Sequence, residues 1–156
     1  MQGLREQVGL VPWDGVEWML RLVLAGIFLY ASADKIIHPH DFAVIVKAYH
    51  LLPEPLANLT ALWLPWLELT IGVCLFTGFL CDGALALATG LLAVFWIALF
   101  IDYFRGIDVA CGCFSSSPEE TAPMLWYIGR DALLLGLALF TVEARRRAGN
   151  ALQLHS

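Results

Sequence analysis

Long apolar stretches separated by short polar connections follow one another along this chain. Each of the four stretches reaches the length of about 20 helical residues that a bilayer core of about 30 Å requires. They cover residues 16–37, 56–80, 83–104 and 122–142. The third is the most uniform, because residues 83–101 contain no charged side chain. We therefore predict an all-α fold, a four-transmembrane-helix bundle that forms one integral membrane domain over residues 1–156.

The connection between the first two stretches has an amphipathic pattern. Asp41 is a good helix N-cap, and Pro53 ends the pattern. Between them, apolar side chains recur at helical spacing, at Phe42, Ile45, Val46, Tyr49 and Leu52. A short helix of this kind lies well at a membrane surface. We expect a short interfacial amphipathic helix in the first outer loop.

Composition supports a membrane protein and excludes other classes. Hydrophobic types make up 60% of the residues and charged types 15%, with a mean hydropathy of +0.73. A soluble domain has about 25% charged residues, so a water-soluble enzyme domain and a disordered chain are both excluded. Nine Lys and Arg against fourteen Asp and Glu give a net charge of −5. This balance argues against a nucleic-acid partner, and the expected surrounding is the lipid bilayer.

Basic residues after the fourth stretch predict the orientation. Arg145, Arg146 and Arg147 follow it directly, and such residues are enriched on the cytoplasmic side of a membrane. Four crossings would return the N-terminus to the cytoplasm as well. Residues 38–55 and 102–121 then form loops that face outside. Since the residues before Val16 lack the features of a signal peptide, we expect the first stretch to remain in the mature protein.

Two cysteines in the second outer loop are the first candidates for chemistry. Cys111 and Cys113 stand one residue apart, on the oxidising side of the membrane in this topology. They can form a disulfide, bind a soft metal as a thiolate pair, or remain two unpaired thiols. A disulfide across Gly112 closes a very small ring, and a strained bond of this kind suits exchange. Cys74 and Cys81, in the second span and at its cytoplasmic end, are expected to act as small apolar side chains.

Charged side chains inside the spans are the second group of candidates. Such groups cost several kcal/mol unless they are paired or face a cavity. Counting helical turns places seven of them in the outer half of one bundle: Asp34, Lys35, Glu68, Asp102, Arg105, Arg130 and Asp131. Two interpretations stay open, which are not exclusive. The charges form a structural ion-pair network, or they line a polar cavity that binds a polar headgroup such as a quinone ring.

Three tryptophans and Arg21 each have two possible roles near these charges. Trp63, Trp66 and Trp126 are either aromatic walls of such a cavity or part of a belt at the membrane interface, which is the more common role. Arg21 lies nearer the inner face. It either extends to that face or reaches Glu68 from below.

Several motifs follow one another in a recognisable order. Asp34-Lys35, Pro39, Phe42, Tyr49 and Leu52-Pro53 come first. Leu64-Pro65-Trp66, Glu68-Leu69, Gly72 and Thr77-Gly78 mark the second span, and Cys111-Gly112-Cys113-Phe114 and Arg130-Asp131 come later. This order resembles the methylamine-utilisation MauE family, within the wider DoxX-like group, over about residues 18–140. Ala110 and Ser115 stand where that family often has glycines, which makes this loop stiffer.

The resemblance implies a four-helix protein of the bacterial inner membrane with its Cys loop in the periplasm. The family is described in connection with periplasmic disulfide formation or transfer of reducing equivalents, and its namesake with maturation of a disulfide-rich dehydrogenase subunit. By this resemblance Cys111 and Cys113 are the candidate redox pair. The candidate polar core consists of Lys35, Glu68, Arg130 and Asp131, with Asp34 and Arg105 beside it.

We therefore expect a membrane thiol–disulfide redox protein that exchanges disulfides with a periplasmic thioredoxin-like or disulfide-containing protein. Ubiquinone or menaquinone is the expected electron acceptor, and no tightly bound metal is expected. A nearby cation, Arg105 or Lys35, would favour the attacking thiolate. The alternatives are a soft-metal thiolate binding or transport protein of the copper or mercury type, and a non-catalytic membrane assembly factor. A homodimer is a candidate assembly state.

Overall fold

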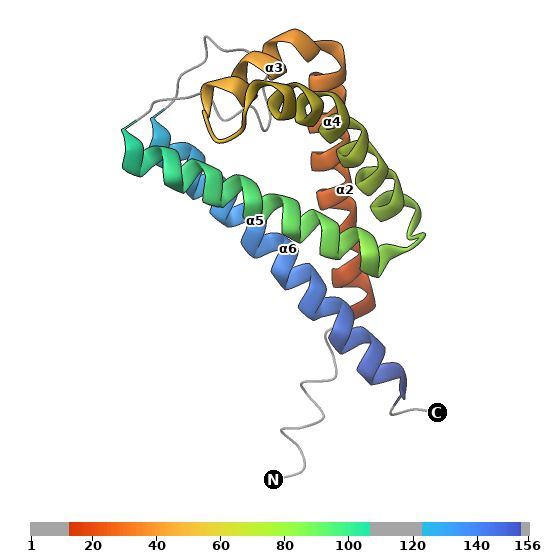
Figure 1. The fold of residues 1–156 in the computed structure, drawn as a ribbon. Coiled ribbons are helices and arrows are strands. Elements are labelled where there is room, and N and C mark those ends of the chain that lie inside the picture. The colour runs from red at the N-terminus through yellow and green to blue at the C-terminus, as the bar shows by residue number, and fades with distance from the viewer. Residues whose placement is uncertain (1–12, 107–122, 154–156) are drawn as a thin grey trace.

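The structure is a computed structural model that describes residues 13–106 and 123–153. These residues form α2 (Trp13–Ile37), α3 (Pro39–Ala48), α4 (Glu54–Thr77), α5 (Cys81–Arg105) and α6 (Met124–Gln153) (Figure 1). Four segments are long and apolar enough to cross a membrane: Gly15–Ile37, Glu54–Thr77, Cys81–Arg105 and Met124–Arg147. The short helix α3 joins the first two. The predicted fold class, an all-α bundle of four spans with a short helix in the first connection, is confirmed.

Proline and glycine mark where these helices begin and end. Pro39 lies in the first turn of α3, where its missing N–H leaves no hydrogen bond unmade. Gly78 ends α4 with φ +78°, and Gly106 ends α5 with φ +67°. Glycine adopts this left-handed conformation without steric cost, and the Gly78 N–H donates to the Cys74 carbonyl at 2.9 Å. The tight turn after Gly78 makes α4 and α5 neighbours.

The four spans form a closed ring of packed neighbours. Helix α2 packs on α4 and α6, and α5 packs on the same two helices. Helix α3 lies across α4 at one end of the bundle (Figure 1). The start of α2, the α4–α5 turn and the C-terminal part of α6 lie at the opposite end. The described ends of the chain are therefore at one end of the bundle, and α3 and the last turn of α5 are at the other.

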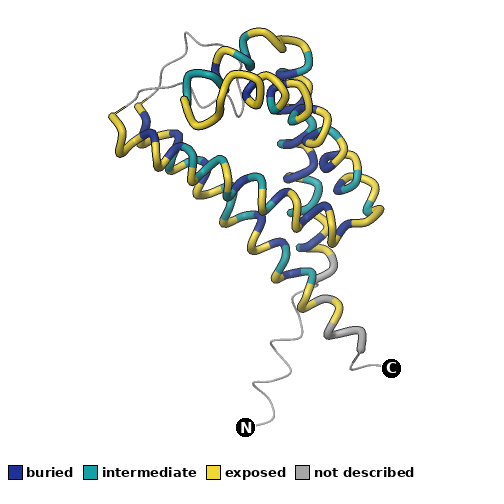
Figure 2. Tube along the Cα trace, in the orientation of Figure 1, coloured by how far each residue is buried: buried dark blue, intermediate teal, exposed yellow. Residues whose placement is uncertain are grey.

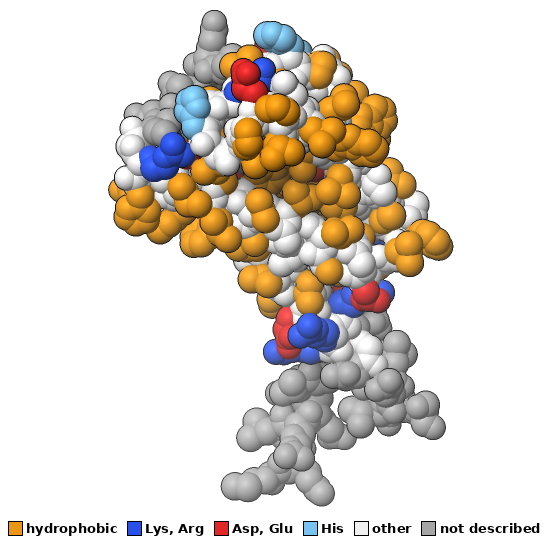
Figure 3. Space-filling view, in the orientation of Figure 1, with side chains coloured by type: hydrophobic (Ala, Val, Ile, Leu, Met, Phe, Trp, Pro, Cys, Tyr) orange, Lys and Arg blue, Asp and Glu red, His pale blue; other side chains and the backbone are white. Residues whose placement is uncertain are grey.

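Burial follows the inward faces of the helices (Figure 2). The core contains Leu24, Ala25, Leu75, Ala88 and Ala138, all of them fully buried. Large apolar side chains such as Trp63, Phe104 and Leu133 point outward instead. Hydrophobic side chains cover the middle of the molecule, whereas charged ones gather near its ends (Figure 3). A bilayer favours an apolar outer surface, and it tolerates charged side chains within a span only when they face the interior of the bundle.

Candidate functional site: the polar core of the bundle

A buried ion pair joins α2 to α4. Lys35 Nζ lies 2.7 Å from Glu68 Oε2, and the two side chains are 1% and 4% exposed. Lys35 comes from the last turn of α2 and Glu68 from the second half of α4. The Phe42 ring of α3 lies 5.4 Å from the same ammonium, within range of a cation–π contact. The structure therefore brings together the first two side chains of the predicted polar core.

A second pair belongs to α6. Arg130 donates from Nε and Nη2 to Asp131 Oδ1, at 3.0 and 2.8 Å. Asp131 is buried, whereas the Arg130 guanidinium is partly exposed and lies 5.4 Å from the Tyr127 ring. Two planar donors on one oxygen hold the carboxylate firmly in place. Arg130 thus balances the charge of a carboxylate that the helix directs inward.

Both carboxylates line one small cavity. Glu68 and Asp131 border a space of about 30 Å³ at the centre of the bundle, together with apolar side chains that include Phe28, Ala31 and Leu92. Lys35 and Arg130 do not line this space, because each is directed to its own carboxylate. Among the described residues, this small cavity is therefore bordered by the two carboxylates, with Lys35 and Arg130 beside them.

This cavity does not fit a quinone ring. Pockets for small organic ligands have volumes of about 300–1,000 Å³, ten times the volume found here or more. Trp63, Trp66 and Trp126 are all mostly exposed, as expected for a lipid-facing belt rather than cavity walls. Trp63 and Trp66 instead border a groove of about 650 Å³ on the outer face of α4.

The remaining predicted members lie away from the central pair. Arg105 donates to the Tyr49 carbonyl at 3.1 Å and lies 3.5 Å from the fully buried Asp102, so it ties the end of α5 to the end of α3. Asp34 lies 3.6 Å from His38 at the end of α2. The structure therefore divides the predicted charge cluster into a central part and a part at the end of the bundle that holds α3.

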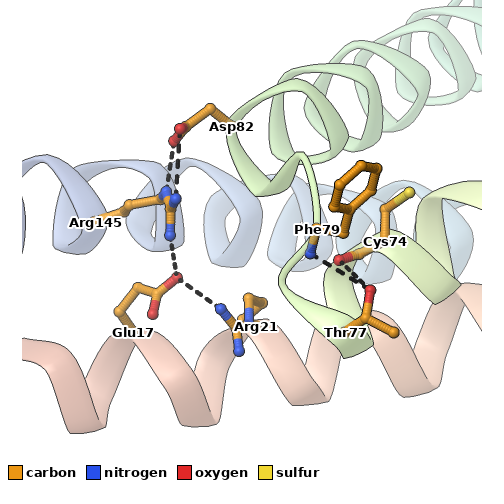
Figure 4. A network of polar contacts seen from close by, with 7 residues as sticks. All are labelled: Glu17, Arg21, Cys74, Thr77, Phe79, Asp82 and Arg145. Atoms are coloured by element: carbon orange, nitrogen blue, oxygen red, sulfur yellow. Dashed lines mark hydrogen bonds and ion pairs between the residues drawn. The ribbon is translucent and has the colours of Figure 1, made fainter.

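A further polar network lies at the opposite end of the bundle (Figure 4). Arg145 of α6 donates to Glu17 of α2 at 3.2 Å and to Asp82 of α5. Arg21 lies 3.9 Å from Glu17 and beside Gly78, so it does not take the predicted alternative of pairing with Glu68. Sequence reasoning treated Arg145 as an orientation signal alone. The usable clue was that Glu17, Asp82 and Arg145 all lie near the same end of their spans.

Two of the four cysteines, Cys74 and Cys81, lie within the described residues. Cys81 is buried in the apolar core and Cys74 packs against the same cluster, as expected for small apolar side chains. Cys111 and Cys113 lie outside the described residues. Within residues 13–106 and 123–153, no group of three His, Cys, Asp or Glu side chains is arranged to hold a metal ion.

Comparison with known proteins identifies the family. A family model described as methylamine utilisation protein MauE matches residues 14–142. The methylamine utilization protein MauE of Paracoccus denitrificans is 35% identical over 126 residues, which are 80% of this chain and 67% of the relative. The protein of the same name from Methylorubrum extorquens is 38% identical over 125 residues, 80% of this chain and 65% of the relative.

The chain thus spans about two thirds of the length of these relatives. No solved structure matches it significantly. The matched region begins at the start of α2 and includes the first three spans, most of the fourth, and both central ion pairs. The chain belongs to the MauE family of methylamine utilisation proteins.

Proposed function

We propose that this protein carries out thiol–disulfide exchange at one face of the membrane, with Cys111 and Cys113 as its redox pair. The observation that carries the proposal is topological. The segment with Cys111-Gly112-Cys113 follows α5 and precedes α6 in the sequence, and α5 ends at the end of the bundle that also holds α3. In the proposed orientation this end faces the periplasm and the chain termini face the cytoplasm.

The proposed reaction has two balanced steps. A disulfide between Cys111 and Cys113 accepts two electrons and two protons from a dithiol of an exported protein, whose own S–S bond forms. The resulting dithiol returns two electrons and two protons to an acceptor, and the bond between Cys111 and Cys113 forms again. A ring this small favours the reduced form and so makes the disulfide a good oxidant of other thiols.

We propose a lipid-soluble quinone, ubiquinone or menaquinone, as the acceptor in the second step. Because the central cavity is too small for the ring, no step of the reaction passes through that cavity. The groove beside Trp63 and Trp66 has the required volume and is open to the lipid side of α4. Aromatic walls of this kind suit stacking on a planar ring.

Membership of the family suggests the physiological setting. We propose that the exported partner is a disulfide-containing protein of methylamine utilisation. The support is that the relatives are named methylamine utilization protein MauE. The position of Arg145, Arg146 and Arg147 beside the fourth span supports a cytoplasmic C-terminus, since orientation depends on the number of basic residues rather than on net charge.

Serine substitutions test the redox pair. The purified protein is reduced, mixed with a short-chain ubiquinone or menaquinone analogue, and assayed for quinol formation and for loss of free thiols. We expect Cys111→Ser and Cys113→Ser each to abolish both signals. Cys74→Ser is the matched control on a half-buried cysteine and should retain them.

The same assay separates the rival functions. Thiols that ignore quinone but become blocked by copper or zinc would overturn the redox proposal in favour of a soft-metal site. A protein whose Cys111→Ser and Cys113→Ser variants fully support partner maturation in cells would instead be a non-catalytic assembly factor.

A further inference from the structure

The cavity at the centre of the bundle is bordered by all four spans. Helices α2 and α5 contribute apolar side chains, including Ala31 and Leu92, whereas α4 and α6 contribute the carboxylates Glu68 and Asp131. Within the described residues, α4 and α6 have no direct backbone packing, because they occupy diagonal positions in the ring. The two carboxylates therefore face a shared space across the axis of the bundle.

Glu68 has hydrogen-bonding capacity that the described residues do not use. Its Oε2 accepts from Lys35 at 2.7 Å, and within the described residues Oε1 has no hydrogen-bond partner. A carboxylate oxygen that faces a small cavity is stabilised by a donor within that cavity. Asp131 presents a second carboxylate to the same cavity, and a carboxylate has about four acceptor sites. The cavity thus offers two acceptors to a small donor.

Water has the size and the chemistry that this cavity selects. One water molecule needs about 10–15 Å³ of free space and two or more polar partners, and the cavity provides about 30 Å³. We propose that the cavity holds one or two water molecules that donate hydrogen bonds to Glu68 and Asp131 and so couple these two buried carboxylates.

The surrounding charges favour a neutral occupant. Lys35 from α2 balances Glu68, and Arg130 from α6 balances Asp131. The α5 wall is apolar, with Leu92 and Phe95, and α3 contributes the Phe42 ring against Lys35. Among the described residues these two pairs are balanced in charge, so a metal cation would add a net charge to them, whereas water adds none. This inference does not depend on Cys111 or Cys113, so it stands or fails separately from the redox proposal.

Solid-state NMR on the unmodified protein in lipid bilayers tests for the water directly. Magnetisation transferred from water should reach the methyl group of Ala31, which lines the cavity, and should be absent at Ala25 and Ala138, which are fully buried in the apolar core. Equal absence of transfer at all three methyl groups would overturn the proposal.

Infrared spectroscopy with carbon-13-labelled glutamate tests whether water couples Glu68 to Asp131. Because Glu68 and Asp131 share water, Asp131→Asn should shift the Glu68 carboxyl band. Ala31→Leu fills the cavity, so Asp131→Asn should no longer shift the band in that background. The matched change Ala132→Leu is on an exposed position of α6 and should leave the shift unchanged.

Ala31→Val serves as a smaller filling change if Ala31→Leu does not yield a folded protein. A Glu68 band that stays in place on Asp131→Asn, or a shift that survives filling of the cavity, would show that no water connects the carboxylates.

Discussion

Lys35 and Glu68 are ionisable side chains in the interior of a membrane-spanning bundle, and each is stabilised there by its contact with the other. Their 2.7 Å contact is almost completely shielded from the surroundings. Removal of one partner from such a pair costs about 3–5 kcal/mol, because the other charge remains buried. Lys35→Met should therefore lower the free energy of unfolding by about 3–5 kcal/mol, measured by reversible denaturation in mixed micelles.

The double variant Lys35→Met/Glu68→Leu should recover most of that loss, since it leaves no unpaired charge. Arg147→Ala removes a half-exposed pair with Glu143 and should cost about 1 kcal/mol or less. A double variant as unstable as Lys35→Met alone would contradict this account of the pair.

At the scale of helices, the contact between α2 and α4 depends on one glycine. A Cβ atom on Gly72 would lie 2.9 Å from two side-chain atoms of Leu29 and 3.2 Å from its backbone nitrogen. Close approach of two spans through a small residue is a common device in membranes. Gly72→Ala should therefore destabilise the bundle by about 1–3 kcal/mol, the usual cost of overpacking, in the same unfolding assay.

Gly90 provides the matched control for that change. A Cβ atom there would have no neighbour within 4 Å, so Gly90→Ala should be neutral or slightly stabilising because alanine favours a helix. Equal losses for the two alanine variants would assign the effect to helix propensity instead of to the contact with Leu29.

The C-terminal part of α6 is attached to the bundle by Arg145. This side chain connects α6 to Glu17 of α2 and to Asp82 of α5. Because the site is partly exposed, we expect Arg145→Gln to cost on the order of 1 kcal/mol globally. The larger effect should be faster hydrogen exchange in the last turns of α6. Arg146→Gln, on an exposed neighbour, should leave exchange unchanged, and equal exchange in both variants would contradict a role for Arg145.

The helices could be predicted from the sequence, whereas the partners of the charged side chains could not. The four spans and the short helix follow from hydrophobic length and from helical spacing between Phe42 and Leu52, which are local properties. That charged groups inside spans need partners was also predictable, but the choice of partner was not. Lys35 pairs with Glu68, whereas Arg105 turns to Asp102 and Tyr49, because pairing depends on helix rotation. The volume of the central cavity depends on packing from four helices at once.

At the scale of the whole molecule, the ring of four spans fixes which segments share a membrane face. The start of α2 and the C-terminal part of α6 lie together, so both described ends of the chain must be on one side. We expect reporter fusions after residue 12 and after residue 153 to give the same cytoplasmic signal, and a fusion in the connection after Gly106 to give the opposite one. Opposite signals from the two terminal fusions would contradict a four-span topology.

The central claim, a redox pair at the outer face, is tested most directly by trapping the state of Cys111 and Cys113 in native membranes. Free thiols in freshly isolated membranes are alkylated immediately, and the intact mass of the protein then gives the number of alkylated cysteines. The same measurement is repeated after reduction, and again after a quinone analogue is added to the reduced protein. We predict a disulfide that reduction opens and quinone restores, with Cys74 and Cys81 as thiols throughout. Cys111 and Cys113 that remain alkylatable thiols in native membranes and after quinone would contradict it.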